Sequence, residues 1–87
     1  GSIKFTSTTN PNGQTYNIPI PAEDDYPAGL YVWIVYDGNL GDITALTQNG
    51  SPALANWAKV HDYPTYKAYR TNLLQSEDAG SDYAITI

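Results

Sequence analysis

Short stretches of the chain alternate between apolar and polar residues with a period of two. Such alternation places the apolar side chains on one face of a β-strand and the polar side chains on the other. Residues 3–8, 15–20 and 82–87 follow this pattern and predict three strands. Pro19 has no backbone N–H to donate to a neighbouring strand, so the strand over 15–20 is expected at the edge of a sheet.

Residues 30–36, LYVWIVY, are apolar at every position and give the strongest strand prediction in the chain. A strand that is apolar on both faces is usually covered on both, which predicts a central position in its sheet. Residues 43–47 predict a short returning strand beyond a tight loop. Residues 65–74 are compatible with a strand or a helix, and their Tyr and Thr content favours a strand.

One short helix is predicted near residues 51–61. Ser51 is a favourable N-cap, and Pro52 is well suited to the first helical position. Trp57 and His61 then lie four residues apart, on the same helical face.

These elements predict a mainly β fold, a small antiparallel β-sandwich of five to six strands with the one short helix near 51–61. The alternative is an α+β two-layer arrangement, in which the helix covers the Tyr31 and Trp33 face of the central strand. A length of 87 residues fits a single domain over 1–87. Residues 1–2, Gly-Ser, are expected to be vector-derived.

Composition narrows the classes of partner. The net charge is −5 and the four basic residues are spread along the chain, whereas a nucleic acid needs clustered Lys and Arg. Nucleic acid is therefore not an expected partner. The longest apolar stretch is far too short to span a bilayer, so membrane insertion is not expected either. Sparse charge with abundant Thr, Asn, Ser, Gly and Tyr is typical of a secreted or cell-surface (extracellular) domain.

Ten of the eleven aromatic residues are Tyr or Trp, with a single Phe. Their rings combine an apolar face with a hydrogen-bonding edge, which suits a glycan or a protein surface as partner. The candidate ligand-binding residues are Tyr63, Tyr66, Tyr69, Trp33, Trp57 and Asn72. The alternative for the two Trp residues is a place in the hydrophobic core, because a small domain needs large side chains there.

Catalysis is not expected. His61 is the only histidine, and on a helix the adjacent Asp62 would point about 100° away from it. A domain of this size seldom builds the enclosed cleft that paired catalytic carboxylates need. The absence of cysteine removes disulfides and thiolate nucleophiles. The sequence therefore predicts a protein that is not an enzyme.

Two acidic loops are candidate calcium sites, since hard cations prefer several oxygen ligands from a compact loop. The candidate ligands are Asp37, Asn39 and Asp42 in the first loop, and Glu77, Asp78 and Asp82 in the second. The alternative is that these residues form turns through their own side-chain hydrogen bonds. Residues 75–83 also resemble the acidic loop before the last strand of calcium-dependent bacterial fucose and mannose lectins. The second, Asp- and Asn-rich half of that loop is missing here, so no ligand residue is carried over.

The leading hypothesis is a non-catalytic recognition module of a secreted or surface protein, which binds carbohydrate as lectins and carbohydrate-binding modules do, with Ca²⁺ as a candidate cofactor. A second hypothesis is a structural or assembly module, such as an immunoglobulin-like spacer, a pilus subunit or a phage fibre domain. Such a module would form homo-oligomers through the edge strand at 15–20. A third is a small protein-binding inhibitor or immunity protein that directs its tyrosines and negative charge at a basic target.

Overall fold

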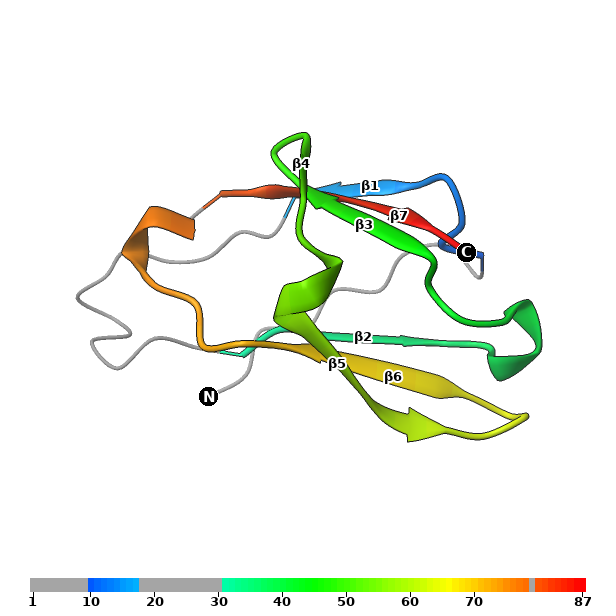
Figure 1. The fold of residues 1–87 in the computed structure, drawn as a ribbon. Coiled ribbons are helices and arrows are strands. Elements are labelled where there is room, and N and C mark those ends of the chain that lie inside the picture. The colour runs from blue at the N-terminus through cyan, green and yellow to red at the C-terminus, as the bar shows by residue number, and fades with distance from the viewer. Residues whose placement is uncertain (1–9, 18–30, 79) are drawn as a thin grey trace.

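The computed structural model describes residues 10–17, 31–78 and 80–87, which form two antiparallel β-sheets packed face to face (Figure 1). The four-stranded sheet has the order β1-β7-β3-β4. Its strands are β1 (Thr15–Asn17), β3 (Ala45–Gln48), β4 (Ser51–Pro52) and β7 (Asp82–Thr86). The three-stranded sheet has the order β2-β6-β5. Its strands are β2 (Trp33–Tyr36), β5 (Trp57–Asp62) and β6 (Lys67–Thr71).

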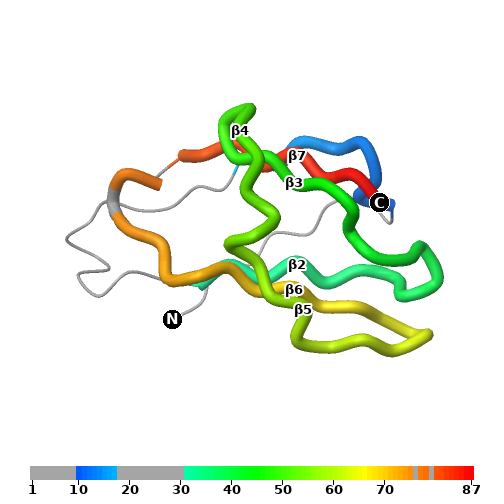
Figure 2. The backbone as a smooth tube through the Cα atoms, viewed as in Figure 1, coloured from blue at the N-terminus to red at the C-terminus, as the bar shows by residue number. Residues whose placement is uncertain are grey.

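The chain crosses repeatedly from one sheet to the other, as the tube in Figure 2 shows. Each of the three single-turn 3-10 helices in the described residues lies on such a crossing: η2 joins β2 to β3, η3 joins β4 to β5, and η4 joins β6 to β7. Their bounds are Gly38–Leu40, Leu54–Asn56 and Ser76–Asp78. The β3-β4 and β5-β6 connections are hairpins that stay within one sheet. The crossings therefore link the two layers at both ends of the sandwich.

The predicted mainly β sandwich is confirmed, and the α+β two-layer alternative is wrong. β7 matches the strand predicted over 82–87, and β6 confirms a strand within 65–74. β3 begins two residues later than the strand predicted over 43–47 and ends one residue later. The described strands number seven, above the five to six expected, because two strands occupy the segment predicted as a helix.

β1 covers the described part of the strand predicted over 15–20. It is the outermost of the described strands in its sheet, as the proline in this segment predicted. The predicted strand over 3–8, the rest of the strand at 18–20 and the vector-derived residues 1–2 lie outside the described residues.

The helix predicted near 51–61 is wrong. Ser51 and Pro52 form β4, where Pro52 lies opposite Thr47, and after the single turn of η3 the chain continues as β5. Trp57 is buried from that strand, and its packing against the opposite sheet outweighs the weak helix signals. Trp57 and His61, which would share a face of the predicted helix, point to opposite sides of β5, because a β-bulge described below lies between them.

The prediction that the strand over 30–36 is covered on both faces is wrong for its described part, β2. It is the outermost described strand of the three-stranded sheet and pairs with β6. Its inward residues Ile34 and Tyr36 pack in or against the core. Its outward residues Trp33 and Val35 are 49% and 62% exposed. The strand is apolar on both faces because one face packs in the core and the other forms an apolar surface.

The core lies between the two sheets. Its least exposed side chains are Leu46, Tyr83 and Ile85. The hydroxyl groups of two buried tyrosines in the three-stranded sheet form hydrogen bonds with the backbone. The Tyr36 hydroxyl donates to the Gly41 carbonyl (2.6 Å), and the Tyr69 hydroxyl accepts from the Ile43 N–H (3.0 Å). These hydrogen bonds compensate for the burial of the hydroxyls and fix the loop between β2 and β3.

Stability is expected to fall at alkaline pH. Burial, and then the neighbouring Tyr69, raise the pKa of Tyr36 far above that of a free phenol. The unfolded chain loses this proton near pH 10, whereas the folded protein retains it, so the free energy of unfolding should hold below about pH 10 and decrease above it. Urea unfolding at about pH 8 and about pH 11 measures the decrease. Tyr36→Phe should reduce it, and an equal decrease in both proteins would contradict this cause.

Candidate functional site

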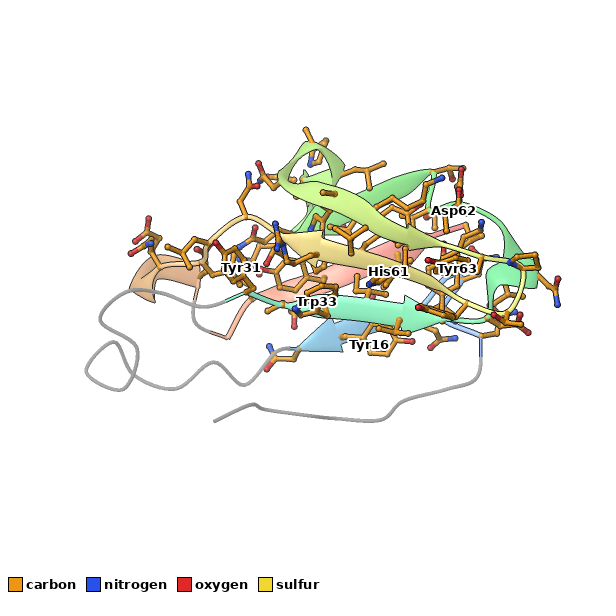
Figure 3. All side chains as sticks on the ribbon, turned by 90° about the horizontal axis from the view of Figure 1, so that it is seen from below. Tyr16, Tyr31, Trp33, His61, Asp62 and Tyr63 are labelled. Carbon is orange, nitrogen blue, oxygen red and sulfur yellow. The ribbon has the colours of Figure 1, made fainter. Side chains whose placement is uncertain are left out.

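Exposed rings cover the outer surface of the three-stranded sheet, which Figure 3 views from below. We call this surface the aromatic face. Its residues are Tyr31, Trp33, Val35, His61, Tyr63, Tyr66 and Arg70. Tyr31, Trp33 and Tyr63 are each about half exposed, and Tyr66 is exposed by about a third. In Figure 3, Tyr31, Trp33, His61 and Tyr63 follow one another along the sheet.

The register of the sheet brings these side chains together from three strands. Trp33 of β2 lies opposite Arg70 of β6, and Val35 lies opposite Ala68. Ala68 in turn lies opposite His61 of β5. Side chains that oppose each other on one face of a sheet are close enough to interact. Ala68 is only 1% exposed, so its larger neighbours cover it and the face has no gap at its centre.

A β-bulge at Val60 determines which side chains of β5 reach the aromatic face. Trp57 points into the core from the start of this strand. With strict alternation, His61 and Tyr63 would point to the same inward side, because they are an even number of residues away. The one-residue register shift between Lys59 and His61 leaves Val60 without an opposite partner on β6 and turns both rings outward.

The rings form a continuous row. Trp33 and His61 are nearly parallel, with 6.4 Å between ring centres and 21° between planes. His61 and Tyr63 are similar, at 6.1 Å and 22°, and Tyr63 lies 5.2 Å from Tyr66. Mutual contact of this kind restricts the rotamers of exposed rings before any ligand arrives, which lowers the entropy cost of binding.

Arg70 contacts both Tyr31 and Trp33, the two rings at one end of the row. Its guanidinium carbon lies 4.8 Å from the centre of the Tyr31 ring and 5.8 Å from that of Trp33, within the range of a cation–π interaction. The Arg70 Nε is buried and has no hydrogen-bond partner among the described residues. The aromatic neighbours therefore hold this side chain in place.

Backbone contacts fix the hairpin that carries Tyr63 and Tyr66. The Tyr63 N–H donates to the Tyr66 carbonyl at 2.9 Å. Gly38 of η2 packs against the backbone of Tyr63 and Pro64, so closely that a β-carbon on this glycine would overlap the Tyr63 carbonyl oxygen. The η2 turn therefore supports this end of the aromatic face.

Two lysines and two aspartates form an ion-pair network beside the same hairpin. Lys59 Nζ lies 3.1 Å from Asp42 Oδ1 and 3.0 Å from Asp62 Oδ2. Lys67 Nζ pairs with Asp62 and lies 3.6 Å from Asp42. Hydrogen bonds from Lys67 and then Lys59 lower the pKa of Asp62, and Asp62 raises the pKa of both lysines. The network links the loop after η2 to β5 and β6.

The outer surface of the four-stranded sheet is different. Its outward positions alternate with the buried residues of β3 and β7 and carry small or polar side chains. These are Thr15, Asn17, Ala45, Thr47, Pro52, Asp82, Ala84 and Thr86. Within the described part of the chain, the large exposed rings are therefore confined to one of the two outer surfaces.

The predicted ligand-binding residues fall into three places. On the aromatic face lie Trp33, Tyr63 and Tyr66. Tyr69 and Trp57 are 6% and 8% exposed, so they belong to the core and offer no ring face to a ligand at this surface. Asn72 is exposed just beyond the end of β6, away from the hairpin.

Four residues of the aromatic face were not among the predicted ligand-binding residues: Tyr31, Val35, His61 and Arg70. The signal for Tyr31 was available, because it lies two residues before Trp33 and so shares its strand face. His61 could be placed only by knowing that Val60 forms a bulge.

The first candidate calcium loop uses its oxygens within the protein. Asp37 Oδ1 accepts from the Asn39 N–H at 3.0 Å, which is the turn geometry that Asp favours. Asp42 accepts from Lys59 and pairs with Lys67. The loop is therefore explained by turn chemistry and ion pairing.

The second candidate calcium loop has similar internal bonds. Asp78 accepts from Gln48 Nε2 at 2.7 Å and from the Gln75 N–H at 2.9 Å. Asp82 accepts from Asn17 Nδ2 at 2.9 Å, while Glu77 is exposed. Over the described ranges, no three His, Asp or Glu side chains gather as a metal site would require. Calcium binding stays a prediction.

The surroundings of His61 are aromatic. Its ring contacts Trp33, Tyr63 and Tyr66. The adjacent Asp62 points to the other side of the sheet and pairs with the lysines. In the part of the chain that the structure describes, no carboxylate therefore orients this imidazole as a general base.

Comparison of the chain with protein-family models, curated proteins and solved structures finds no match. None of the helices within residues 10–17, 31–78 and 80–87 is long and apolar enough to cross a bilayer. The chemistry of the aromatic face is therefore the main guide to function.

Proposed function

We propose that this protein is a non-catalytic recognition module of a secreted or surface protein, and that its aromatic face binds an extended glycan chain. The observation that carries the proposal is the one-sided display of rings. Tyr31, Trp33, Tyr63 and Tyr66 are exposed together on one sheet, while the described outer surface of the other sheet has no aromatic ring. A small domain that needed its rings only for stability would bury them, and exposed apolar patches usually bind a partner.

The chemistry of the face suits a sugar. Each ring has both an apolar surface and a polar atom at its edge: the hydroxyl of Tyr, the N–H of Trp or the nitrogens of His. Pyranose rings have the complementary arrangement, with C–H groups on their faces and hydroxyls around their edges. Among the seven residues that define the face, Val35 is the one aliphatic residue and Arg70 is the one Lys, Arg, Asp or Glu.

The size of the face favours a narrow ligand over a protein. β2, β6 and β5 have four, five and six residues, so this sheet measures roughly 17 Å by 10 Å. A standard protein–protein interface buries about 800 Å² on each partner, well above such a footprint. The row of rings is longer than a single sugar, which favours a chain of several residues lying along it.

A glycan array with the intact protein tests the proposal, and Trp33 fluorescence identifies the binding surface. Trp57→Phe leaves Trp33 as the sole indole while keeping a ring in the core. The expected result is array binding to oligosaccharide chains, with a change of Trp33 emission that grows with chain length. A blank array together with unchanged emission on added polysaccharide would reject glycan binding.

Two other outcomes would favour the alternative hypotheses. A stable homo-oligomer at micromolar concentration, measured by light scattering and coupled to protection of Trp33, would indicate an assembly module. Tight, selective capture of one protein that quenches Trp33, with no response to sugars, would indicate a protein-binding inhibitor or immunity protein.

A further inference from the structure

Arg70 carries a positive charge that no carboxylate of the described chain compensates. The structure describes three basic side chains, those of Lys59, Lys67 and Arg70. Both lysines pair with Asp42 and Asp62 in the network beside the hairpin. The Arg70 guanidinium forms no ion pair and no hydrogen bond within the described residues. Its charge is therefore free to pair with a ligand.

The aromatic face holds this guanidinium in a fixed position. On β6, the middle strand of the three-stranded sheet, Arg70 lies opposite Trp33 of β2 and Ala58 of β5. Its guanidinium carbon is 4.8 Å from the centre of the Tyr31 ring and 5.8 Å from that of Trp33. A ring face attracts a cation less strongly than a carboxylate that accepts two of its N–H groups. The rings therefore position the guanidinium without supplying acceptors for its N–H groups.

The terminal nitrogens of Arg70 are the part of the group that a ligand reaches. The side chain is half-buried, and Nε is the one guanidinium nitrogen that is both buried and without a hydrogen-bond partner. The two terminal nitrogens also have no partner among the described residues, so they keep contact with solvent. They present two N–H groups side by side, with a spacing that matches two oxygens of a carboxylate or a sulfate.

The surroundings of Arg70 on the aromatic face contain no opposing acid. None of the seven residues that define the face is Asp or Glu. Asp62 of β5 points to the other side of the sheet, where the two lysines balance its charge and that of Asp42. The net charge of −5 repels an anion over longer distances. At physiological ionic strength such repulsion is largely screened beyond about 8 Å. The described part of the face is therefore locally positive on an acidic protein.

We infer that the glycan bound by the aromatic face is acidic and that Arg70 pairs with its carboxylate or sulfate groups. This inference rests on the function proposed above. An acidic group is attached at the rim of a sugar ring, so the sugar can stack on Tyr31 or Trp33 while the acidic group reaches the guanidinium between them. A hydroxyl in the same place offers a single neutral oxygen, whereas the acid offers charge and two acceptors. Arg70 is therefore the residue that selects acidic over neutral chains.

The test compares chains that differ only in the acidic group, using the intact protein. Oligomers of galacturonate and of glucuronate are measured beside their methyl esters, and sulfated galactose oligomers beside their desulfated forms, by isothermal titration calorimetry. At least one acidic chain should bind about tenfold more tightly than its neutral counterpart, as expected for one charge-assisted pair. The preference should decrease with added salt, because an ion pair at a half-buried position is partly screened. The uronate and sulfated pairs show which acidic group is recognised.

Three variants assign the preference to Arg70. Arg70→Gln removes the charge but no ion pair or hydrogen bond of the described chain, so the fold should persist while the acidic chain binds about tenfold more weakly. Arg70→Lys keeps the charge without the planar pair of donors, so it should retain only part of the preference. Lys59→Gln is the matched control: it also lowers the net charge by one, away from the aromatic face, and should retain the full preference.

The outcomes separate this inference from the proposed function. If the esters and desulfated chains bind as tightly as the acidic forms, or if the array returns only neutral glycans, the inference is wrong and glycan binding by the aromatic face stands. If Lys59→Gln reduces the preference as much as Arg70→Gln does, the effect belongs to net charge and the role of Arg70 is rejected. A blank array with unchanged Trp33 emission would reject the proposed function and this inference with it.

Discussion

Gly38→Ala is expected to destabilise the domain by more than about 4 kcal/mol, which is enough to unfold much of the population at room temperature. Gly38 is buried, and a β-carbon built on it would overlap the Tyr63 carbonyl oxygen and lie 2.9 Å from that of Pro64. Both neighbours are backbone atoms at the turn of the β5-β6 hairpin, so neither can rotate away. Relief requires the hairpin and the η2 turn to separate. Circular dichroism and urea unfolding measure the loss.

Gly50→Ala is the matched control for this substitution. Gly50 has φ +83°, but a β-carbon there would meet no atom within 4 Å. Its replacement therefore carries only the cost of a left-handed backbone conformation, about 1 kcal/mol. If Gly38→Ala and Gly50→Ala unfold at similar urea concentrations, the close contact between the turn and the hairpin is not as tight as described.

Trp33→Ala is expected to weaken glycan-chain binding about 30-fold, which corresponds to about 2 kcal/mol. Trp33 lies at the middle of the row, between the Arg70 guanidinium and the His61 ring. Its loss would interrupt the row and release both neighbours. Stability should change by less than about 1 kcal/mol, because the indole is half exposed. Isothermal titration calorimetry with the best oligosaccharide from the array measures the affinity.

Two further variants separate this site from any other surface. Tyr63→Ala, at the hairpin end of the row, should cost less affinity than Trp33→Ala, about fivefold, because residues at an interface rim contribute less than central ones. Thr86→Ala, on the outer surface of the opposite sheet, should have no effect. Unchanged affinity in both Trp33→Ala and Tyr63→Ala would place the glycan away from the aromatic face.

Local sequence patterns were sufficient for strands whose two faces differ. β7 alternates regularly, and its buried Tyr83 and Ile85 are those that the pattern points inward. Local patterns were not sufficient for β2, because the identity of an apolar residue does not show whether its side chain faces the core or an exposed patch. The residues that suggested coverage on both faces, Trp33 and Val35, belong to the aromatic face.

The candidate site could be predicted only in part for a related reason. Trp33, Tyr63 and Tyr66 were identified by residue type, but the same criterion selected Tyr69 and Trp57, which are buried. Separating the two groups requires the register of β5 and β6. That register depends on the bulge at Val60. The position of a bulge is determined by tertiary packing, and no single residue type predicts it.

The bulge at Val60 also has a consequence for how β5 tolerates mutation. Before residue 60 the odd-numbered position Trp57 is needed for folding, and after it the odd-numbered position His61 faces solvent and other rings. Conserved positions should therefore be odd-numbered before Val60 and even-numbered after it. Relatives of this domain would be expected to vary Ala58 freely, and to exchange His61 according to what each one recognises.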